Sequence, residues 1–375
     1  MREALGAAPI PAGPVWVAAV GKAAAAMALG AHDALAGRIE RTLIISTDAL
    51  LAPLAARPHW ELQPGAHPLP DERSLAAGAR LWSWVEEVPP AAQPLFLISG
   101  GASSLVEVLK PGTTLAELRE LNAQGHAAGI DIATLNARRA ALSCIKAGGL
   151  AARLAGRPAR ALLMSDVPRD DPEVIGSGLL GRAGGGPDAV ERQVIASIAQ
   201  ALAGAADCAC ELGLTVHVSG GRFAGEAARL AARFTHELLL GQAQLCLWGG
   251  ESTVRLPPRP GRGGRNQQLA LAAARLLAGQ PDLLLLAAGT DGIDGVTEDA
   301  GALVDGETCA RITLAALDPE AALAAADAGT ALAASGDLLH TGPTGTNVGD
   351  LVLGLKMSVA QARGRARGGA AARVL

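Results

Sequence analysis

Short apolar runs alternate along the chain with longer alanine-rich stretches. The runs have the length and the leucine and valine content of buried strands, while the alanine-rich stretches between them are typical of helices. Strand-length runs occur at residues Val15–Val20, Leu43–Ile45, Leu95–Ile98, Ala161–Met164, Val216–Val218, Leu245–Trp248 and Leu283–Ala288. This alternation indicates repeated strand–helix units and predicts an α/β fold with a largely parallel sheet.

Several of these runs end in glycine and in small hydroxyl or acidic residues. Ligands of open α/β sheets bind at the carboxyl ends of the strands, where backbone amides and the next helix N-terminus face an anion. We therefore expect the functional residues at the strand ends.

The length of 375 residues predicts two domains, because single hydrophobic cores usually stop growing below this size. The segment around Phe234–Gln242 is the candidate interdomain connection, which places the domains at residues 1–235 and 243–360.

Composition narrows the class of partner. A net charge of −4, without long blocks of like charge, gives no electrostatic footprint for nucleic acid or an anionic membrane. We therefore expect a small-molecule ligand, and a homodimer is one assembly that the sequence allows.

Five cysteines are scattered and lack paired C-x-x-C spacing, so we expect reduced, mostly buried thiols. The first residues lack the apolar core of a signal peptide, and prolines and glycines interrupt the uncharged stretch at 88–106. A cytoplasmic location is the resulting expectation.

The first candidate site follows the run Val15–Val20, where Gly21 and Lys22 precede a helical stretch. A lysine at a helix start can neutralise a phosphate or a carboxylate. A Walker loop would need glycine at position 16 and serine or threonine at 23, where this chain has Trp16 and Ala23. P-loop chemistry is therefore excluded, and a solvated turn lysine is the alternative.

The next two strand ends carry a glycine–serine turn and a carboxylate. Ser99, Gly100, Gly101 and Ser103 can form an anion-binding nest, although glycine turns also serve helix packing. Asp166 follows the run Ala161–Met164, where a base or a metal ligand would be needed.

The G-x-G-x-x-G match at 176–181 fails its context, because no strand directly precedes it and no helix follows it.

Three later turns complete the candidate set. Gly264, Arg265 and Asn266 open a helix and suit phosphate binding, with an exposed basic turn as the alternative. Asp291 and Asp294, interleaved with glycines after Leu283–Ala288, can hold Mg²⁺ or can simply accept hydrogen bonds from turn amides. A last hydroxyl-rich turn supplies Thr341, Thr344 and Asn347, for which a plain loop is the alternative.

In order and spacing, these segments resemble the class II glycerate kinases, the family with a C-terminal MOFRL domain. The resemblance covers nearly the whole chain. It is carried by the strings at 20–24, 64–68, 99–101, 142–146, 263–267, 289–295 and 341–344. The chain departs from the family pattern at Ala140, Ala141 and Gln268, among other positions.

The resemblance implies a larger N-terminal Rossmann-like domain with a parallel sheet, a smaller C-terminal α/β domain, and an active site in the cleft between them. It also implies ATP and Mg²⁺ as cofactors and D-glycerate as the substrate, with 2-phosphoglycerate as the product. The site candidates carried over by resemblance are Lys22, Asn136, Arg139, Asp166, Arg265, Asp291 and Asn347, with Lys146 as a weaker one.

Together these inferences assign catalytic roles to Lys22, Asp166 and Arg265, and Mg²⁺ binding to Asp291 and Asp294. The substrate- and nucleotide-binding candidates are Ser99, Gly100, Gly101, Ser103, Asn136, Arg139, Gly264, Asn266, Thr341, Thr344 and Asn347. Two rival hypotheses are a hydroxypyruvate reductase that uses NAD(P)H and a metabolite-binding protein without catalysis.

Overall fold

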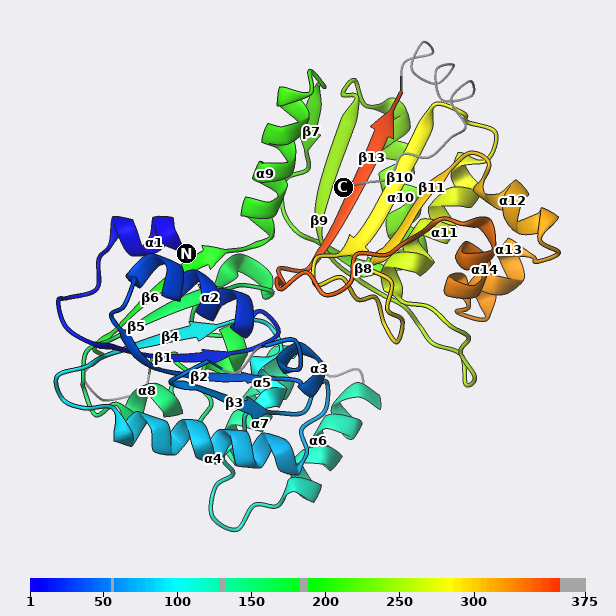
Figure 1. The fold of residues 1–375 in the computed structure, drawn as a ribbon. Coiled ribbons are helices and arrows are strands. Elements are labelled where there is room, and N and C mark those ends of the chain that lie inside the picture. The colour runs from blue at the N-terminus through cyan, green and yellow to red at the C-terminus, as the bar shows by residue number, and fades with distance from the viewer. Residues whose placement is uncertain (55–56, 128–131, 183–187, 358–375) are drawn as a thin grey trace. The chain divides into compact units, whose positions relative to one another are not determined.

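The computed structural model describes residues 1–54, 57–127, 132–182 and 188–357. The chain divides into two compact units (Figure 1). The first contains Met1–Ser197 together with Gly345–Val348, and the second contains Ile198–Thr344 and the residues from Gly349. This division lies earlier in the chain than the boundary expected around Phe234–Gln242.

The first unit contains six strands, which form one sheet in the order β3-β2-β1-β4-β5-β6 with every pair parallel. The strands are β1 (Val15–Val20), β2 (Ile39–Ser46), β3 (Trp60–Pro64), β4 (Gln93–Ile98), β5 (Ala159–Met164) and β6 (Val190–Ala196). This is the strand order of the Rossmann fold, and it confirms the predicted parallel N-terminal sheet.

Helices cover both faces of this sheet, with α2 on one face and α4 and α8 on the other (Figure 1). The α-helices of the unit are α1 (Arg2–Ala7), α2 (Ala24–Leu35), α3 (Asp48–Leu51), α4 (Glu72–Glu87), α5 (Ala102–Leu105), α6 (Leu115–Ala127), α7 (Ile132–Leu142) and α8 (Gly149–Arg153). Two short 3₁₀ turns, η1 (Pro168–Asp170) and η2 (Ile175–Gly178), follow β5.

The core of the first unit lies between the sheet and α4. Trp84 of α4 is fully buried, and its ring meets Phe96 of β4 edge-on at 5.6 Å. The start of α4 is fixed by Asp71, whose side chain accepts the Arg73 amide at 2.8 Å, while Ser74 accepts the Asp71 amide. Such a reciprocal cap fixes the point at which the helix begins.

The second unit contains a mixed sheet in the order β12-β11-β10-β13-β9-β7, with β8 paired to β9. Its strands are β7 (Val216–Val218), β8 (Phe223–Glu226), β9 (Leu245–Thr253), β10 (Leu283–Gly289), β11 (Gly301–Asp305), β12 (Leu338–Leu339) and β13 (Asp350–Lys356). Only the pairs of β9 with β7 and β8 are parallel. The expectation of a largely parallel sheet was wrong for this unit, because β10, β11 and β13 neighbour one another in antiparallel register.

The α-helices of the second unit are α9 (Ile198–Glu211), α10 (Ala227–Leu240), α11 (Arg265–Leu277), α12 (Thr308–Leu314), α13 (Pro319–Ala324) and α14 (Ala328–Ser335). Adjacent residues of β9 face opposite sides of the sheet. Trp248 stacks on Phe234 of α10 with ring centroids 4.7 Å apart, whereas Gly249 leaves room for Ile198 of α9.

Phe234 is therefore a core residue of α10, and the interpretation of 234–242 as an interdomain connection was wrong. The predicted second domain, 243–360, omits α9, β7, β8 and α10, which pack with this sheet, and its last residues lie outside the described part of the chain.

The five cysteines are free, but Cys208 and Cys210 are exposed, so the thiols are less buried than expected. Among the described residues, no helix combines the length and the apolar character needed to span a bilayer.

Candidate functional site

The carboxyl edge of the first sheet gathers three of the predicted turns. Lys22 follows β1, Gly100 follows β4 and Asp166 follows β5, and these three strands are neighbours in the sheet. The strand order reverses between β1 and β4, which is where open α/β sheets form their ligand crevice. The Lys22 amide donates to the Gly100 carbonyl at 2.8 Å and thereby joins the first two turns.

Ser99 supports the Lys22 turn from behind. It is fully buried, and its Oγ accepts the Ala23 amide at 3.1 Å. Gly21 has φ of 132° and lies so close to Ser99 that a β-carbon would overlap the Ser99 side chain. Ser99 was predicted to bind a ligand, but its buried hydroxyl instead holds the β1 turn in place.

Asp166 and Asn347 meet above Gly100. Asn347 Nδ2 donates to Asp166 Oδ2 at 3.4 Å, and both side chains are partly buried. A β-carbon on Gly100 would overlap these same two atoms, so any larger residue there would displace the Asp166 and Asn347 side chains. The predicted residues Gly100, Asp166 and Asn347 are therefore brought together, with Asn347 contributed by the Gly345–Val348 stretch of the first unit.

A pocket of about 180 Å³ lies beside Gly101. The residues that line it are His67, Pro68, Pro70, Gly101, Ser103, Ser104, Leu118, Asn122, Arg139 and Lys146. Four of these were predicted from the sequence, namely Gly101, Ser103, Arg139 and the weaker candidate Lys146. Ser103 Oγ is hydrogen-bonded to the Ser177 hydroxyl.

Arg139 supplies positive charge to this pocket. Its Nε donates to Asn122 Oδ1 at 2.5 Å and its Nη1 to Asn136 Oδ1 at 3.2 Å. Burial lowers the pKa of Arg139, and Glu107 opposes that effect. Asn136, another predicted residue, therefore orients the Arg139 guanidinium, a group suited to charge-assisted hydrogen bonds with an anion.

The second unit gathers the remaining candidates at the start of α11. Asp294 Oδ1 accepts the Asn266 amide at 3.0 Å and Asp294 Oδ2 accepts the Gln267 amide at 2.8 Å. Asp294 also approaches Gly264 so closely that no side chain fits there. Burial raises the pKa of Asp294 to about 6, against the effect of the two amides.

Both carboxylate oxygens of Asp294 are thus committed to the first turn of the helix. This geometry matches the alternative in which Asp294 is structural, and it disfavours Asp294 as a metal ligand.

Arg265, the first residue of α11, is held by two carboxylates. Its Nε and Nη2 donate to the two oxygens of Asp350 at 2.7 and 3.0 Å, and its Nη1 donates to Glu251 Oε1 at 2.6 Å. Burial alone would lower the pKa of Arg265, but Asp350 and Glu251 raise it above its usual value. Sequence reasoning had not identified either partner.

Asp291 lies in the turn after β10, where its Oδ1 accepts the Ile293 amide at 3.2 Å. Both Asp291 Oδ1 and Asn266 Nδ2 lie close to Gly289. Thr344 donates its hydroxyl to the Thr290 carbonyl, and Thr341 lies against Gly292. Within the described ranges, no three His, Cys, Asp or Glu side chains form a group able to hold a metal ion.

Sequence reasoning missed three residues around the Arg139 pocket: His67, Glu107 and Asn122. His67 follows β3 near the carboxyl edge of the sheet and belongs to the string at 64–68. Its strand-end position and that string are the signals that could have identified it. Glu107 and Asn122 belong to no motif, because their partners lie 39 and 17 residues away in the chain.

Comparison with known proteins shows related sequences along most of the chain. Residues 4–197 match the family model described as a domain of unknown function, DUF4147, and residues 244–350 match the MOFRL family. A relative from Agrobacterium vitis named "Putative hydroxypyruvate reductase" is 36% identical, with 91% of this chain and 87% of the relative covered.

The D-glycerate 2-kinase of Thermotoga maritima is 33% identical, with 91% of this chain and 90% of that protein covered. A crystal structure of glycerate kinase from the same organism superposes with a TM-score of 0.83 at 30% identity, with 95% of each chain covered.

Proposed function

Since the chain belongs to the class II glycerate kinase family, we propose that it transfers the γ-phosphoryl group of ATP to D-glycerate, giving 2-phosphoglycerate. The observation that carries this proposal within the structure is the meeting of Lys22, Gly100 and Asp166 at the strand-order switch of the first sheet. A cation, an open backbone and a carboxylate at such a point are the groups that phosphoryl transfer requires.

Phosphoryl transfer depends on positioning and on neutralising charge, and the proposed roles follow from that demand. Lys22 stabilises the phosphoryl group in transfer. Asp166, oriented by Asn347, accepts the proton of the attacking hydroxyl. The pocket at Arg139 holds the hydroxy acid, and the glycine turn at Gly100 allows phosphate oxygens to approach the backbone.

Arg265 is proposed as a second cation for the phosphates. A guanidinium has five N–H donors, and the contacts with Asp350 and Glu251 use three of them. Its position at the first turn of α11 also gives it the favourable dipole of a helix N-terminus.

Magnesium, if held at Asp291, would supply positive charge that neutralises the charge developing during transfer. The donor set fits a site with few protein ligands, since Mg²⁺ commonly uses one or two carboxylates besides phosphate and water. Asp291, which is partly exposed, is the carboxylate proposed for it, whereas Asp294 is proposed as a structural residue.

A hydroxypyruvate reductase would need a nicotinamide site, and the glycine pattern argues against one. The first strand–helix turn has Gly21, Lys22 and Ala23 in place of a G-x-G-x-x-G fingerprint. The match at 176–181 begins in η2, where Gly176 and Ser177 have φ of 61° and 57°, and no α-helix begins among residues 178–182, the last ones described before the gap at 183–187. These features favour the kinase.

Free cysteines are consistent with a reducing compartment, which supports a cytoplasmic location.

The test is to incubate the purified protein with D-glycerate, ATP and Mg²⁺ and to measure ADP, omitting each component in turn. A parallel reaction contains hydroxypyruvate and NADH. We expect ADP only in the complete mixture and no NADH oxidation. NADH oxidation without ADP formation would establish the reductase, and glycerate binding without either reaction would indicate a binding protein.

A further inference from the structure

A buried ion pair lies beside two pockets of the first unit, and Lys146 lines both of them. Glu107 and Lys146 are only 1% and 4% exposed, and Lys146 Nζ donates to Glu107 Oε2. Ser143 Oγ donates to Glu107 Oε1 at 2.5 Å, and the Val108 amide donates to the same oxygen at 3.0 Å. The Glu107 carboxylate is therefore fully engaged and cannot turn toward a ligand.

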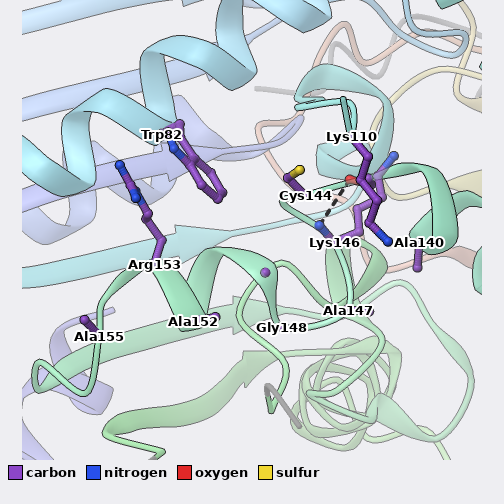
Figure 2. A pocket seen from close by; sticks show the side chains of 12 residues that line it. Trp82, Lys110, Ala140, Cys144, Lys146, Ala147, Gly148, Ala152, Arg153 and Ala155 are labelled. Carbon is purple, nitrogen blue, oxygen red and sulfur yellow. Dashed lines mark hydrogen bonds between the residues drawn. The ribbon is translucent and has the colours of Figure 1, made fainter. Parts of the chain in front are cut away.

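Lys146 lines both pockets. On one side is the pocket of about 180 Å³ that contains Arg139. On the other is a wider and more open pocket of about 660 Å³, whose lining includes Lys110, Cys144 and Arg153 (Figure 2). Figure 2 shows Lys110 near Lys146 on this pocket, where the Lys146 backbone amide also donates to Ser143 Oγ at 3.3 Å.

A buried ion pair is a poor source of stability, because desolvation of the two charges offsets most of their attraction. Burial lowers the pKa of Lys146, and Glu107 opposes that effect. The pair therefore calls for an explanation other than stability, and the position of Lys146 in the wall of the Arg139 pocket suggests one.

Arg139 differs from Arg265 in its partners. Its guanidinium contacts the amide oxygens of Asn122 and Asn136, and no described carboxylate bonds to it. Apart from the His67 imidazole, the charged groups at this pocket are Arg139, Lys146 and, behind Lys146, Glu107. Two cations and one carboxylate leave one net positive charge.

We propose that Glu107 is a specificity-determining residue that cancels the charge of Lys146, so that the pocket presents the single charge of Arg139 and selects one carboxylate over a polyphosphate chain. This inference rests on the proposed kinase function, and it assigns the hydroxy-acid carboxylate to Arg139.

The size of the pocket agrees with this assignment. Pockets for drug-sized ligands usually measure about 300–1,000 Å³. A volume of about 180 Å³ admits a three-carbon acid but not a nucleotide.

The decisive variants are Lys146→Met and the double variant Glu107→Gln/Lys146→Met. Lys146→Met leaves Glu107 opposite Arg139 with no net charge, so we expect the KM for D-glycerate to rise about tenfold or more, which corresponds to about 1.4 kcal/mol. The double variant restores the single charge of Arg139, so its KM should return to within about threefold of the unmodified protein. The kcat and the KM for ATP should change less than about twofold in both variants.

Two matched controls separate charge from packing. Lys110→Met removes the same charge from the other pocket, and Ser143→Ala removes a hydrogen bond to Glu107 without changing charge. Both should leave the KM for D-glycerate within about threefold of its original value.

D-glycerate binding is also measured by calorimetry at pH 8, with thermal melting to verify folding. A double variant as weak as Lys146→Met would overturn the proposal, because Lys146 would then contact the substrate itself. Unchanged glycerate binding in Lys146→Met would equally overturn it.

If Lys146→Met does not fold, the double variant alone tests the inference. D-glycerate binding by the double variant that is more than about tenfold weaker than by the unmodified protein would refute it. Absence of turnover in the unmodified protein would count against the kinase function alone, since calorimetry tests the pocket separately.

Discussion

Replacing Arg265 by methionine should destabilise the second unit, because the buried carboxylate of Asp350 would lose its ion-pair partner. Asp350 is 1% exposed at its side chain, and both of its oxygens accept hydrogen bonds from Arg265. The contact with Glu251 matters less, because the Glu251 side chain is 54% exposed.

Removing one partner of a buried pair costs about 3–5 kcal/mol. The Arg265 side chain is 39% exposed, so solvent screens the pair and the lower end, about 3 kcal/mol, applies. For a unit of this size, that loss corresponds to a fall in Tm of roughly 6–12 °C.

The double variant Arg265→Met/Asp350→Asn separates the structural role of Arg265 from the proposed catalytic one. It removes the unpaired charge of residue 350, so most of the lost free energy of unfolding should return in urea and thermal unfolding. Turnover should stay reduced about a hundredfold or more in both variants, which is the effect of losing one preorganised donor. Recovery of both stability and turnover in the double variant would show that Arg265 acts only as the partner of Asp350. A loss below about 1 kcal/mol in Arg265→Met would refute the reasoning from burial.

Three further predictions concern single side chains. Lys22→Met should lower kcat about a hundredfold or more with little change in Tm, and near-normal turnover would identify Lys22 as a solvated turn lysine. Asp291→Asn should retain the turn but shift the Mg²⁺ requirement upward in rate titrations, so an active variant with an unchanged Mg²⁺ curve would remove Asp291 from the site. The pKa of Asp294 is raised from 3.8 to about 6, so between these pH values the folded state binds a proton that the unfolded state has lost. The free energy of unfolding therefore falls as the pH rises through this range. The loss reaches about 3 kcal/mol above pH 6, and Asp294→Asn should remove that slope from unfolding free energies measured between pH 4 and 7; parallel curves for the two proteins would contradict this.

Local sequence patterns predicted seven of the strands, because a buried strand often has a continuous apolar run. They did not single out the other strands, which are β3, β6, β8, β11, β12 and β13. Val15–Val20 and Val216–Val218 are strands with the predicted bounds, and the run Leu283–Ala288 lies within β10, an interior strand. Parallel pairing in the first unit then explains why Lys22, Gly100 and Asp166 lie on neighbouring strand ends.

Strand direction in the second sheet could not be predicted, because apolar runs in parallel and antiparallel sheets look alike when both faces are covered. The assignment of Phe234 to an interdomain connection has a different cause. Its segment carries charged and polar residues on the exposed face of α10, and these obscure a helix whose other face is buried.

The sequence also could not predict which side chains pair with each other when they lie far apart in the chain. Arg265 and Asp350 are separated by 85 residues, and Glu107 and Lys146 by 39. The sequence identified Arg265 by its place at a helix start but gave no sign that a carboxylate holds it. The two oxygens of Asp294 likewise bind amides 27 and 28 residues away, and only the fold reveals that arrangement.

The identity of the phosphorylated product tests the central claim most directly. The protein is incubated with D-glycerate, ATP and Mg²⁺, and the product is identified by phosphorus NMR against authentic 2-phosphoglycerate and 3-phosphoglycerate. We predict a 2-phosphoglycerate signal that grows in step with ADP and is absent from a matched reaction of the Lys22→Met variant. A reaction that yields 3-phosphoglycerate would contradict the assigned position of transfer, and the absence of any phosphorylated glycerate would contradict the kinase itself.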